Sequence, residues 1–176
     1  GTRPILTALS APPVGPRVRR PAPSGRREFP AATRARARCL RGTPPIRRAS
    51  APAVLLLDDD AAILGREAID RAHQVLSRDA KVAAIAFAQA DSRGQRRDDS
   101  MQPSRSHAPC YVPAFIGFAH MVRRDQFLAI GGYREPFVFY GEEKEFCLRL
   151  IEAGYRTVYL PDALVMHDPD PAGRSQ

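Results

Sequence analysis

The stretch Val54–Asp60, Val-Leu-Leu-Leu-Asp-Asp-Asp, places three carboxylates directly after an unbroken apolar run. A short run of branched apolar residues that stops abruptly in polar ones predicts a strand buried on both faces, as in a parallel α/β sheet. The carboxyl end of such a strand is where these sheets bind ligands. Adjacent acids repel one another, so a fold that gathers them usually supplies a cation, and oxygen ligands favour Mg²⁺ or Mn²⁺. A strand followed by an ordinary acidic turn is the alternative.

The positive charge of the chain is concentrated in its first 50 residues. The whole sequence has a formal net charge of +8, yet residues 1–50 contain 12 arginines and a single acid, Glu28. The rest of the chain is therefore mildly acidic and has no electrostatic footprint for DNA or RNA, so we expect no nucleic-acid partner. Cys39, Cys110 and Cys147 are too few and too scattered for a disulfide framework, which indicates free thiols in a reducing compartment.

Residues 1–52 are predicted to be disordered, and residues 53–176 to form the folded domain. The first 50 residues contain nine prolines and no lysine, and they show no helical or strand periodicity. Such a composition cannot bury enough apolar surface to offset its chain entropy. A basic tail that contacts anionic lipid or nucleic acid, a flexible linker, and a stretch translated out of frame are the three explanations. The arginine-only composition among Pro and Ala favours the third.

Apolar periodicity and turn residues predict three helices and three further extended segments after the first strand. The predicted helices are 65–77, 124–130 and 142–153, and the extended segments are 81–88, 111–122 and 155–160. Pro161 is expected to close the last strand. Glu145 and Arg149 are spaced to form an ion pair on the last helix, and Gly154 is expected to end that helix. The polar residues 91–108 predict a long mobile loop of the kind that often covers a site.

An ordered set of short motifs resembles the family 2 glycosyltransferases. The pieces are, in order, Asp58-Asp59-Asp60, Gly131-Gly132-Tyr133-Arg134-Glu135, Tyr140-Gly141-Glu142-Glu143, Glu145 with Leu148-Arg149-Leu150, Gly154-Tyr155-Arg156, Tyr159-Leu160-Pro161 and His167. No single piece is specific, because three acids after a strand occur widely, but the order and spacing of the set are. The resemblance implies a partial GT-A fold, a nucleotide-diphospho-sugar transferase domain with a mostly parallel sheet and flanking helices.

The same resemblance implies an inverting, metal-dependent transfer of a sugar from a nucleotide-diphospho-sugar donor to the hydroxyl of a glycan or lipid-linked acceptor. Asp58 and Asp60 match the family's D-x-D, of which the first faces the donor and the last binds Mn²⁺ or Mg²⁺. Asp59 is assigned to the donor side as an orienting acid. Glu143 matches the second acid of the family's Glu-Asp pair, the catalytic base, with Glu in place of the commoner Asp. His167 matches a histidine near the metal, with an ordinary surface histidine as the alternative.

The resemblance is incomplete at both ends of the chain. The family begins with a strand and turn that hold the nucleotide base, and it continues past the histidine, so we expect this partial domain to bind nucleotide-sugar weakly or not at all. A non-catalytic remnant or basic-tailed binding module is one alternative. A haloacid dehalogenase-type phosphatase is another, with Asp58 as nucleophile, but Ala62 stands where that class prefers Thr or Val.

The expected location follows from the family and the free thiols. Both indicate the bacterial cytoplasm, at the inner face of the membrane, where polysaccharides and cell-envelope glycans are built. Peripheral contact with that membrane is expected on the same ground, although the charge of the folded part gives it no independent support.

Overall fold

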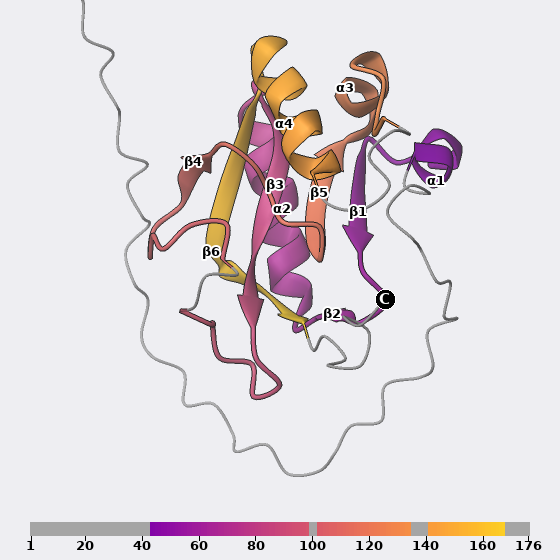
Figure 1. Cartoon of the computed structure of the whole chain (residues 1–176). Coiled ribbons are helices and arrows are strands. Elements are labelled where there is room, and N and C mark those ends of the chain that lie inside the picture. The colour runs from indigo at the N-terminus through magenta and orange to yellow at the C-terminus, as the bar shows by residue number, and fades with distance from the viewer. Residues whose placement is uncertain (1–42, 99–101, 135–140, 168–176) are drawn as a thin grey trace, which may run out of the picture. The chain divides into compact units, whose positions relative to one another are not determined.

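The computed structural model describes residues 43–98, 102–134 and 141–167, all within one compact unit. Its elements are α1 (Thr43–Arg48), β1 (Ala53–Leu57), β2 (Ala61–Ile63), α2 (Arg66–Arg78), β3 (Val82–Ala90), β4 (Cys110–Val112), β5 (Ala119–Arg123), α3 (Arg124–Ala129), α4 (Glu142–Glu152) and β6 (Arg156–His167) (Figure 1). The predicted α/β class is confirmed. The three predicted helices are present, each with its boundaries shifted by at most one residue at either end.

The six strands form one mixed sheet in the order β1-β5-β3-β6-β2, with β4 also paired to β6. Only β3 and β6 run parallel among the described strands, and every other pair is antiparallel. The prediction of a mostly parallel sheet is therefore wrong in this detail. It failed because an apolar run indicates that both faces of a strand are covered, but carries no information about the direction of its neighbours. The same run predicts a strand buried on both faces, whereas β1 is half-buried and lies at one end of the strand order.

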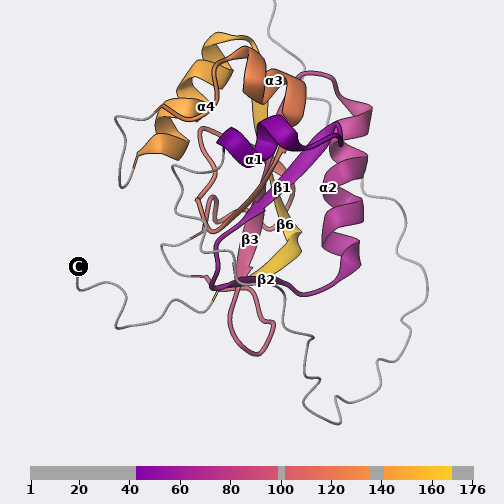
Figure 2. The same ribbon diagram turned by 90° about the vertical axis from the view of Figure 1, so that its right-hand side faces the viewer.

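Helices cover both faces of the sheet, with α2 on one face and α1, α3 and α4 on the other (Figure 2). All nine residues of the central strand β3 are buried. Its alanines at positions 84, 86 and 88 belong to the same cluster as the aromatic side chains Phe127 of α3 and Phe146 of α4. Small residues on the strand therefore leave room for large rings on the helices, and alternating sizes of this kind favour dense packing.

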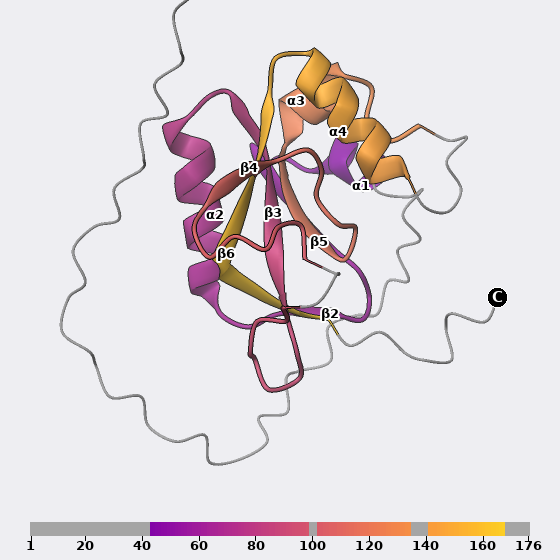
Figure 3. The same ribbon diagram turned by 60° about the vertical axis from the view of Figure 1, so that its left-hand side comes forward.

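The opposite face of β3 carries the large side chains of the strand. Ile85 and Phe87 share a cluster with Ala68, Ala72 and Leu76, which recur every four residues along α2. α2 lies against this face of the sheet (Figure 3) and contributes both small and larger apolar side chains. The two faces together hold β3 in one register, because a shift by one residue would exchange the large and small sides.

Helix α4 is fixed at its end and along its length by interactions that the sequence predicts. After it, Gly154 has a φ of +83° and donates to Ile151 O, while the next N–H donates to Leu150 O, a Schellman motif. The Arg149 guanidinium binds both carboxylate oxygens of Glu145, at 2.6 and 2.7 Å. It also donates to the carbonyl oxygens of Ile130 and Gly132, the latter at 2.7 Å. Arg149 therefore ties α4 to the turn that follows α3.

Strand β6 does not end at Pro161, contrary to the sequence prediction. It continues to His167 and pairs with three other strands. β4 pairs with residues 157–159 and β2 with residues 165–167, while the register with β3 skips from Leu160 to Leu164. Pro161 lies in the gap between these pairings. A proline is tolerated there because no ladder hydrogen bond is required of its nitrogen.

The last part of the predicted disordered segment is ordered, whereas residues 1–42 lie outside the described residues. Ile46 of α1 is 1% exposed and belongs to the cluster of Phe127. The Arg124 guanidinium donates to the carbonyl oxygens of Ile46 and Arg47 at 3.2 and 3.0 Å, and its backbone N–H donates to Pro52 O at 2.9 Å. One apolar residue among arginines and prolines has no periodicity, so no pattern in the sequence indicates this helix.

In the part of the chain that the structure describes, no helix has both the length and the apolar composition to cross a bilayer.

We predict that His120 makes the fold sensitive to acid. This residue of β5 is 1% exposed, and its ring stacks on that of Phe115 with centroids 4.0 Å apart. Its Nε2 forms a hydrogen bond with Tyr133 Oη at 2.5 Å. Burial lowers its pKa from 6.5 to about 3. The unfolded chain therefore binds a proton that the folded one does not, and stability falls as the pH drops from about 6.5 towards 3, by up to about 1.4 kcal/mol per pH unit.

Denaturant titrations of the wild type and of His120→Asn over this pH range measure the effect. The variant should be less stable at pH 7, because it loses packing, but its free energy of unfolding should fall less steeply as the pH drops. The exposed His73, replaced in the same way, is the matched control and should leave the slope unchanged. Equal slopes for the wild type and His120→Asn would contradict the prediction.

Candidate functional site

The turn between β1 and β2 and the end of β6 bring three predicted site residues together. β2 pairs with β6 in a register that sets Ala61 opposite His167, so the acidic turn before Ala61 lies beside the histidine. The turn is held by Asp58 N–H, which donates to Phe118 O at 3.0 Å, and by Ala61 N–H, which donates to Asp58 O at 3.1 Å. One ligand atom each of Asp58, Asp60 and His167 lies within 4.8 Å of the others.

The ring of His167 is held on three sides. Its Nε2 lies 3.3 Å from Asp60 Oδ1, and its side chain is 10% exposed against 35% for that of Asp60. The ring stacks on Phe118 with centroids 5.1 Å apart, and its Nδ1 lies 2.9 Å from Nε2 of Gln89. The surface-histidine alternative does not fit such an enclosed ring. Nε2 is thus the ring nitrogen that faces the carboxylates.

The site concentrates negative charge. The pKa of Asp58 is raised above its ordinary value, mainly by burial and next by the charge of Asp60, while His167 acts in the opposite direction. Asp59 and Glu142 add smaller repulsive contributions. A bound cation would remove this repulsion, so the electrostatics of the turn favour one.

A further pair of carboxylates comes from the start of α4. Gly141 precedes this helix with a φ of +109°, a conformation that favours glycine, and Glu142 and Glu143 form its first turn. Burial raises the pKa of Glu143, and the charges of Glu142 and Asp58 raise it further, against hydrogen bonds with the backbone of Glu143 and Gly141. Glu143 therefore shares the electrostatic environment of the acidic turn although 83 residues separate it from Asp60.

Two polar residues at the site had no role in the sequence prediction. Glu142 is 5% exposed, and its Oε2 has no hydrogen-bond partner within the described ranges. Gln89 is 1% exposed and contacts His167. The sequence does carry a signal for Gln89, because it is the one polar residue in the run from Val82 to Ala90. Glu142 has no such signal, because the motif match assigns the role of catalytic base to its neighbour Glu143.

The three clustered residues fit a divalent cation. Two carboxylates and one imidazole give oxygen and nitrogen ligands, a set that suits Mn²⁺ and also accepts Mg²⁺. Asp58, Asp60 and His167 are therefore the residues that could hold such a cation. Asp59 is exposed and is not part of this cluster. Its assignment to the donor side stays a prediction, as do the roles of the other four residues.

Part of the sequence matches a known family model. Residues 100–167 match the model described as the N-terminal domain of galactosyltransferase. The match includes α4, with Glu142 and Glu143, and ends at His167. Comparison of the whole chain with curated protein sequences gives no match. The family model therefore agrees with the predicted glycosyltransferase resemblance over this segment, and it does not single out family 2.

Solved structures show the same fold. A mannosyltransferase from Pyrobaculum calidifontis, in complex with GDP-Man and Mn²⁺, has a TM-score of 0.57 at 20% identity, over 81% of this chain and 39% of that one. GalNAc-T7, solved with UDP, GalNAc and Mn²⁺, has a TM-score of 0.55 at 15% identity, over 71% and 29%. The protein A197 from STIV has a TM-score of 0.50 at 12% identity, over 72% and 63%. The chain thus has a GT-A-like glycosyltransferase fold, and it spans about two fifths of the mannosyltransferase and under a third of GalNAc-T7.

We predict that Asp58 destabilises the metal-free protein and stabilises the metal-bound one. Asp58→Asn removes a half-buried charge that repels its neighbours, so the Tm without metal should rise by a few degrees. The same change removes a negative charge from the cluster that would hold the cation, so the increase in Tm on adding Mn²⁺, which follows from binding to the folded state only, should be much smaller than in the wild type.

Thermal melts with and without Mn²⁺ test both effects. Asp59→Asn is the matched control, because Asp59 is the exposed neighbour of Asp58, and it should change neither melt appreciably. A lower Tm of metal-free Asp58→Asn, or a full Mn²⁺ response in that variant, would show that the charge balance described above is incorrect.

Proposed function

We propose that this chain is the catalytic part of a glycosyltransferase that moves a sugar from a nucleotide-diphospho-sugar donor to an acceptor hydroxyl, with inversion and with a divalent metal. The observation that carries the proposal is the meeting of Asp58, Asp60 and His167 at one point, in the electrostatic range of Glu143 on α4. The similarity to a galactosyltransferase family model and to structures that contain GDP-Man or UDP supports the donor class.

Asp60 and His167 would hold the metal from two sides, and Asp58 would complete the cluster and face the donor. A divalent cation at such a site stabilises the charge that develops on the departing diphosphate, by several kcal/mol in order of magnitude. The chain contributes a rigid frame for it, because the His167 ring is stacked and hydrogen bonded and the acidic turn is tied to Phe118 by a backbone hydrogen bond. Rigid ligands lose little entropy when they bind a cation.

Glu143 would take the proton of the acceptor hydroxyl. A carboxylate is a better proton acceptor when its pKa lies closer to the working pH, and burial raises the pKa of Glu143 in that direction. The helix that carries it is anchored by Arg149, which binds Glu145 and the carbonyl oxygens of the turn after α3. Base and metal ligands thus come from separate elements, α4 for the base and the β1–β2 turn with the end of β6 for the ligands.

The proposal also includes the family, the acceptor, the location and the metal. The ordered motifs favour family 2, and they place the acceptor among glycans or lipid-linked glycans at the inner face of a bacterial membrane, with Mn²⁺ or Mg²⁺ as the cofactor. Neither a phosphatase of the haloacid dehalogenase type nor a non-catalytic module gains support from the fold comparison or from the geometry of the site.

We predict that Glu143→Gln lowers the turnover number by about 10² to 10⁴, because the amide cannot accept the proton of the acceptor. Binding of Mn²⁺ and of the donor should change little, since Glu143 is not part of the ligand cluster. Transfer assays with a panel of nucleotide-sugars and simple glycan acceptors, together with calorimetry of the donor, measure the two quantities separately.

The exposed Glu152, at the far end of the same helix, provides the control variant Glu152→Gln, which should retain full turnover. The pH profile offers a second check. Turnover of the wild type should fall on the acid side as Glu143 becomes protonated, and because its pKa is raised this limb should lie above the ordinary range of a glutamate. Equal turnover of Glu143→Gln and the wild type would exclude Glu143 as the base.

A further inference from the structure

Gln89 is a polar side chain where the fold otherwise places apolar ones. It lies near the end of β3, is 1% exposed, and is the one polar residue of that strand. Burying an amide costs free energy unless it is hydrogen bonded. Its Nε2 lies 2.9 Å from His167 Nδ1, whereas its Oε1 has no partner among the residues that the structure describes. The amide is therefore half satisfied, and its satisfied half contacts the histidine of the candidate metal site.

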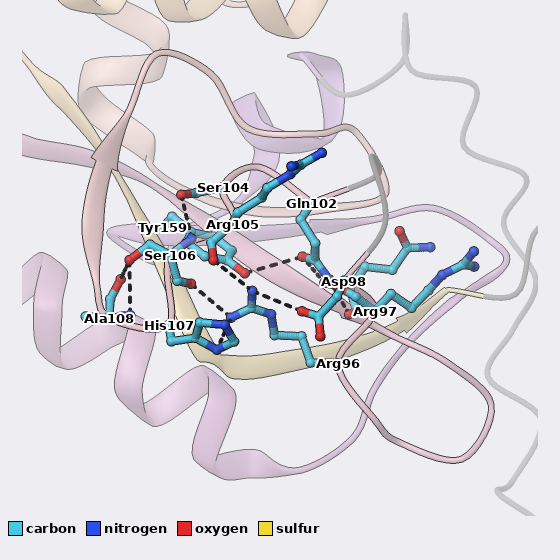
Figure 4. A network of polar contacts seen from close by, with 11 residues as sticks. Arg96, Arg97, Asp98, Gln102, Ser104, Arg105, Ser106, His107, Ala108 and Tyr159 are labelled. Carbon is cyan, nitrogen blue, oxygen red and sulfur yellow. Dashed lines mark hydrogen bonds and ion pairs between the residues drawn. The ribbon is translucent and has the colours of Figure 1, made fainter.

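The backbone of Gln89 is held by the segment that follows β3. The Gln102 amide accepts from Gln89 N–H at 3.0 Å and donates to Gln89 O at 2.6 Å, in the manner of a neighbouring strand. Arg97 N–H also donates to Gln89 O, at 3.0 Å. Tyr159 Oη donates to Gln102 Oε1 at 3.4 Å, which links this clamp to β6 (Figure 4). Gln89 consequently has a fixed backbone, and the freedom left to it is that of its side chain.

The segment that carries Gln102 is itself anchored. The Arg96 guanidinium donates to Ser106 O at 2.9 Å and to Arg105 O at 3.2 Å, and it lies 3.3 Å from Asp98 (Figure 4). Residues 91–108 are predicted to form a mobile loop. In the part of that range that the structure describes, these contacts form a polar network. The clamp on Gln89 therefore rests on a structured support.

The two nitrogens of the His167 ring need different partners in different states. In the neutral ring one nitrogen carries the proton and the other accepts. When Gln89 Nε2 donates to Nδ1, the proton is on Nε2, which faces Asp60 at 3.3 Å. For Nε2 to accept a cation, the proton must be on Nδ1, which then needs an acceptor. A half-turn of the Gln89 amide brings Oε1, the atom without a partner, to that place.

We infer that Gln89 is a positioning residue for His167: its amide fixes the ring and serves Nδ1 as donor without the metal and as acceptor with it, which frees Nε2 for the cation. The inference rests on the proposed function, because it takes His167 as a metal ligand. Partners of metal-bound histidines orient the ring and set which nitrogen carries the proton, and their loss typically weakens metal binding by about 10- to 100-fold.

The test is the affinity for Mn²⁺ alone, measured by the electron paramagnetic resonance signal of the free ion. Gln89→Leu retains the size and the backbone bonds of Gln89 but removes the amide, and it should bind Mn²⁺ about 10- to 100-fold more weakly than the wild type. Gln89→Glu keeps an acceptor for Nδ1–H and should stay within a few-fold of the wild type. Gln74→Leu, the same change on the exposed side of α2, should have no effect.

The outcomes separate this inference from the proposed function. If the wild type binds Mn²⁺ and folded Gln89→Leu binds it equally well, Gln89 has no positioning role while the metal site stands. If the wild type binds no Mn²⁺, the metal site fails and the inference fails with it. Should Gln89→Leu not fold, the wild type labelled with ¹⁵N-histidine and loaded with Zn²⁺ gives the answer. A slowly exchanging proton on Nδ1 of His167 is expected, and an unprotonated Nδ1 would overturn the inference.

Discussion

Strand β6 is the element on which the arrangement of the site depends. It pairs with β3 along most of its length, with β4 near its start and with β2 at its end. The pairing with β2 sets Ala61 opposite His167 and thereby brings the acidic turn to the histidine. The pairing with β3 sets Gln89 opposite Val165, close to the same end. Backbone register thus decides which polar side chains meet, and a strand that stopped at Pro161 would leave the carboxylates without the histidine.

The packed core holds the central strand in place, and the site concentrates negative charge. The central strand is fixed by the opposite size patterns of its two faces, small towards α3 and α4 and large towards α2. Beyond the end of that packed layer, Asp58 and Glu143 have raised pKa values because they are partly buried among like charges. A packed frame can hold such repulsion in place, and a cation can relieve it. Binding and stability are therefore coupled through the same carboxylates.

The sequence predicted those parts of the structure that depend on local chemistry. Helix α4, with its glycine stop and its Glu145–Arg149 pair, follows from periodicity and helix-ending rules, and the structure confirms both. The meeting of Asp58, Asp60 and His167 could be expected only from the ordered motifs, because no local rule joins residues 107 positions apart. Their chemical roles stay predictions.

What the sequence could not supply depends on pairing between distant strands. An apolar run does not indicate the direction of the neighbouring strands, so the sequence does not predict a mixed sheet. Pro161 is a reliable stop only where its nitrogen would need a ladder partner, and here the register of β6 removes that need. Ile46 is a single apolar residue, and Gln89 stands out in the sequence only as a polar residue in an apolar run, so the contacts of both appear only once their neighbours are known. A lone apolar residue and a lone polar one carry no period.

In the function we propose, the acidic turn and His167 form the metal centre of a sugar-transfer enzyme. The most direct measurement is X-ray diffraction at the manganese absorption edge, from crystals of the chain grown with Mn²⁺ and a nucleoside diphosphate. We expect an anomalous peak next to Asp60 and His167, with Asp58 and diphosphate oxygens close to it. A peak bonded to other residues, or none between Asp60 and His167, would contradict it.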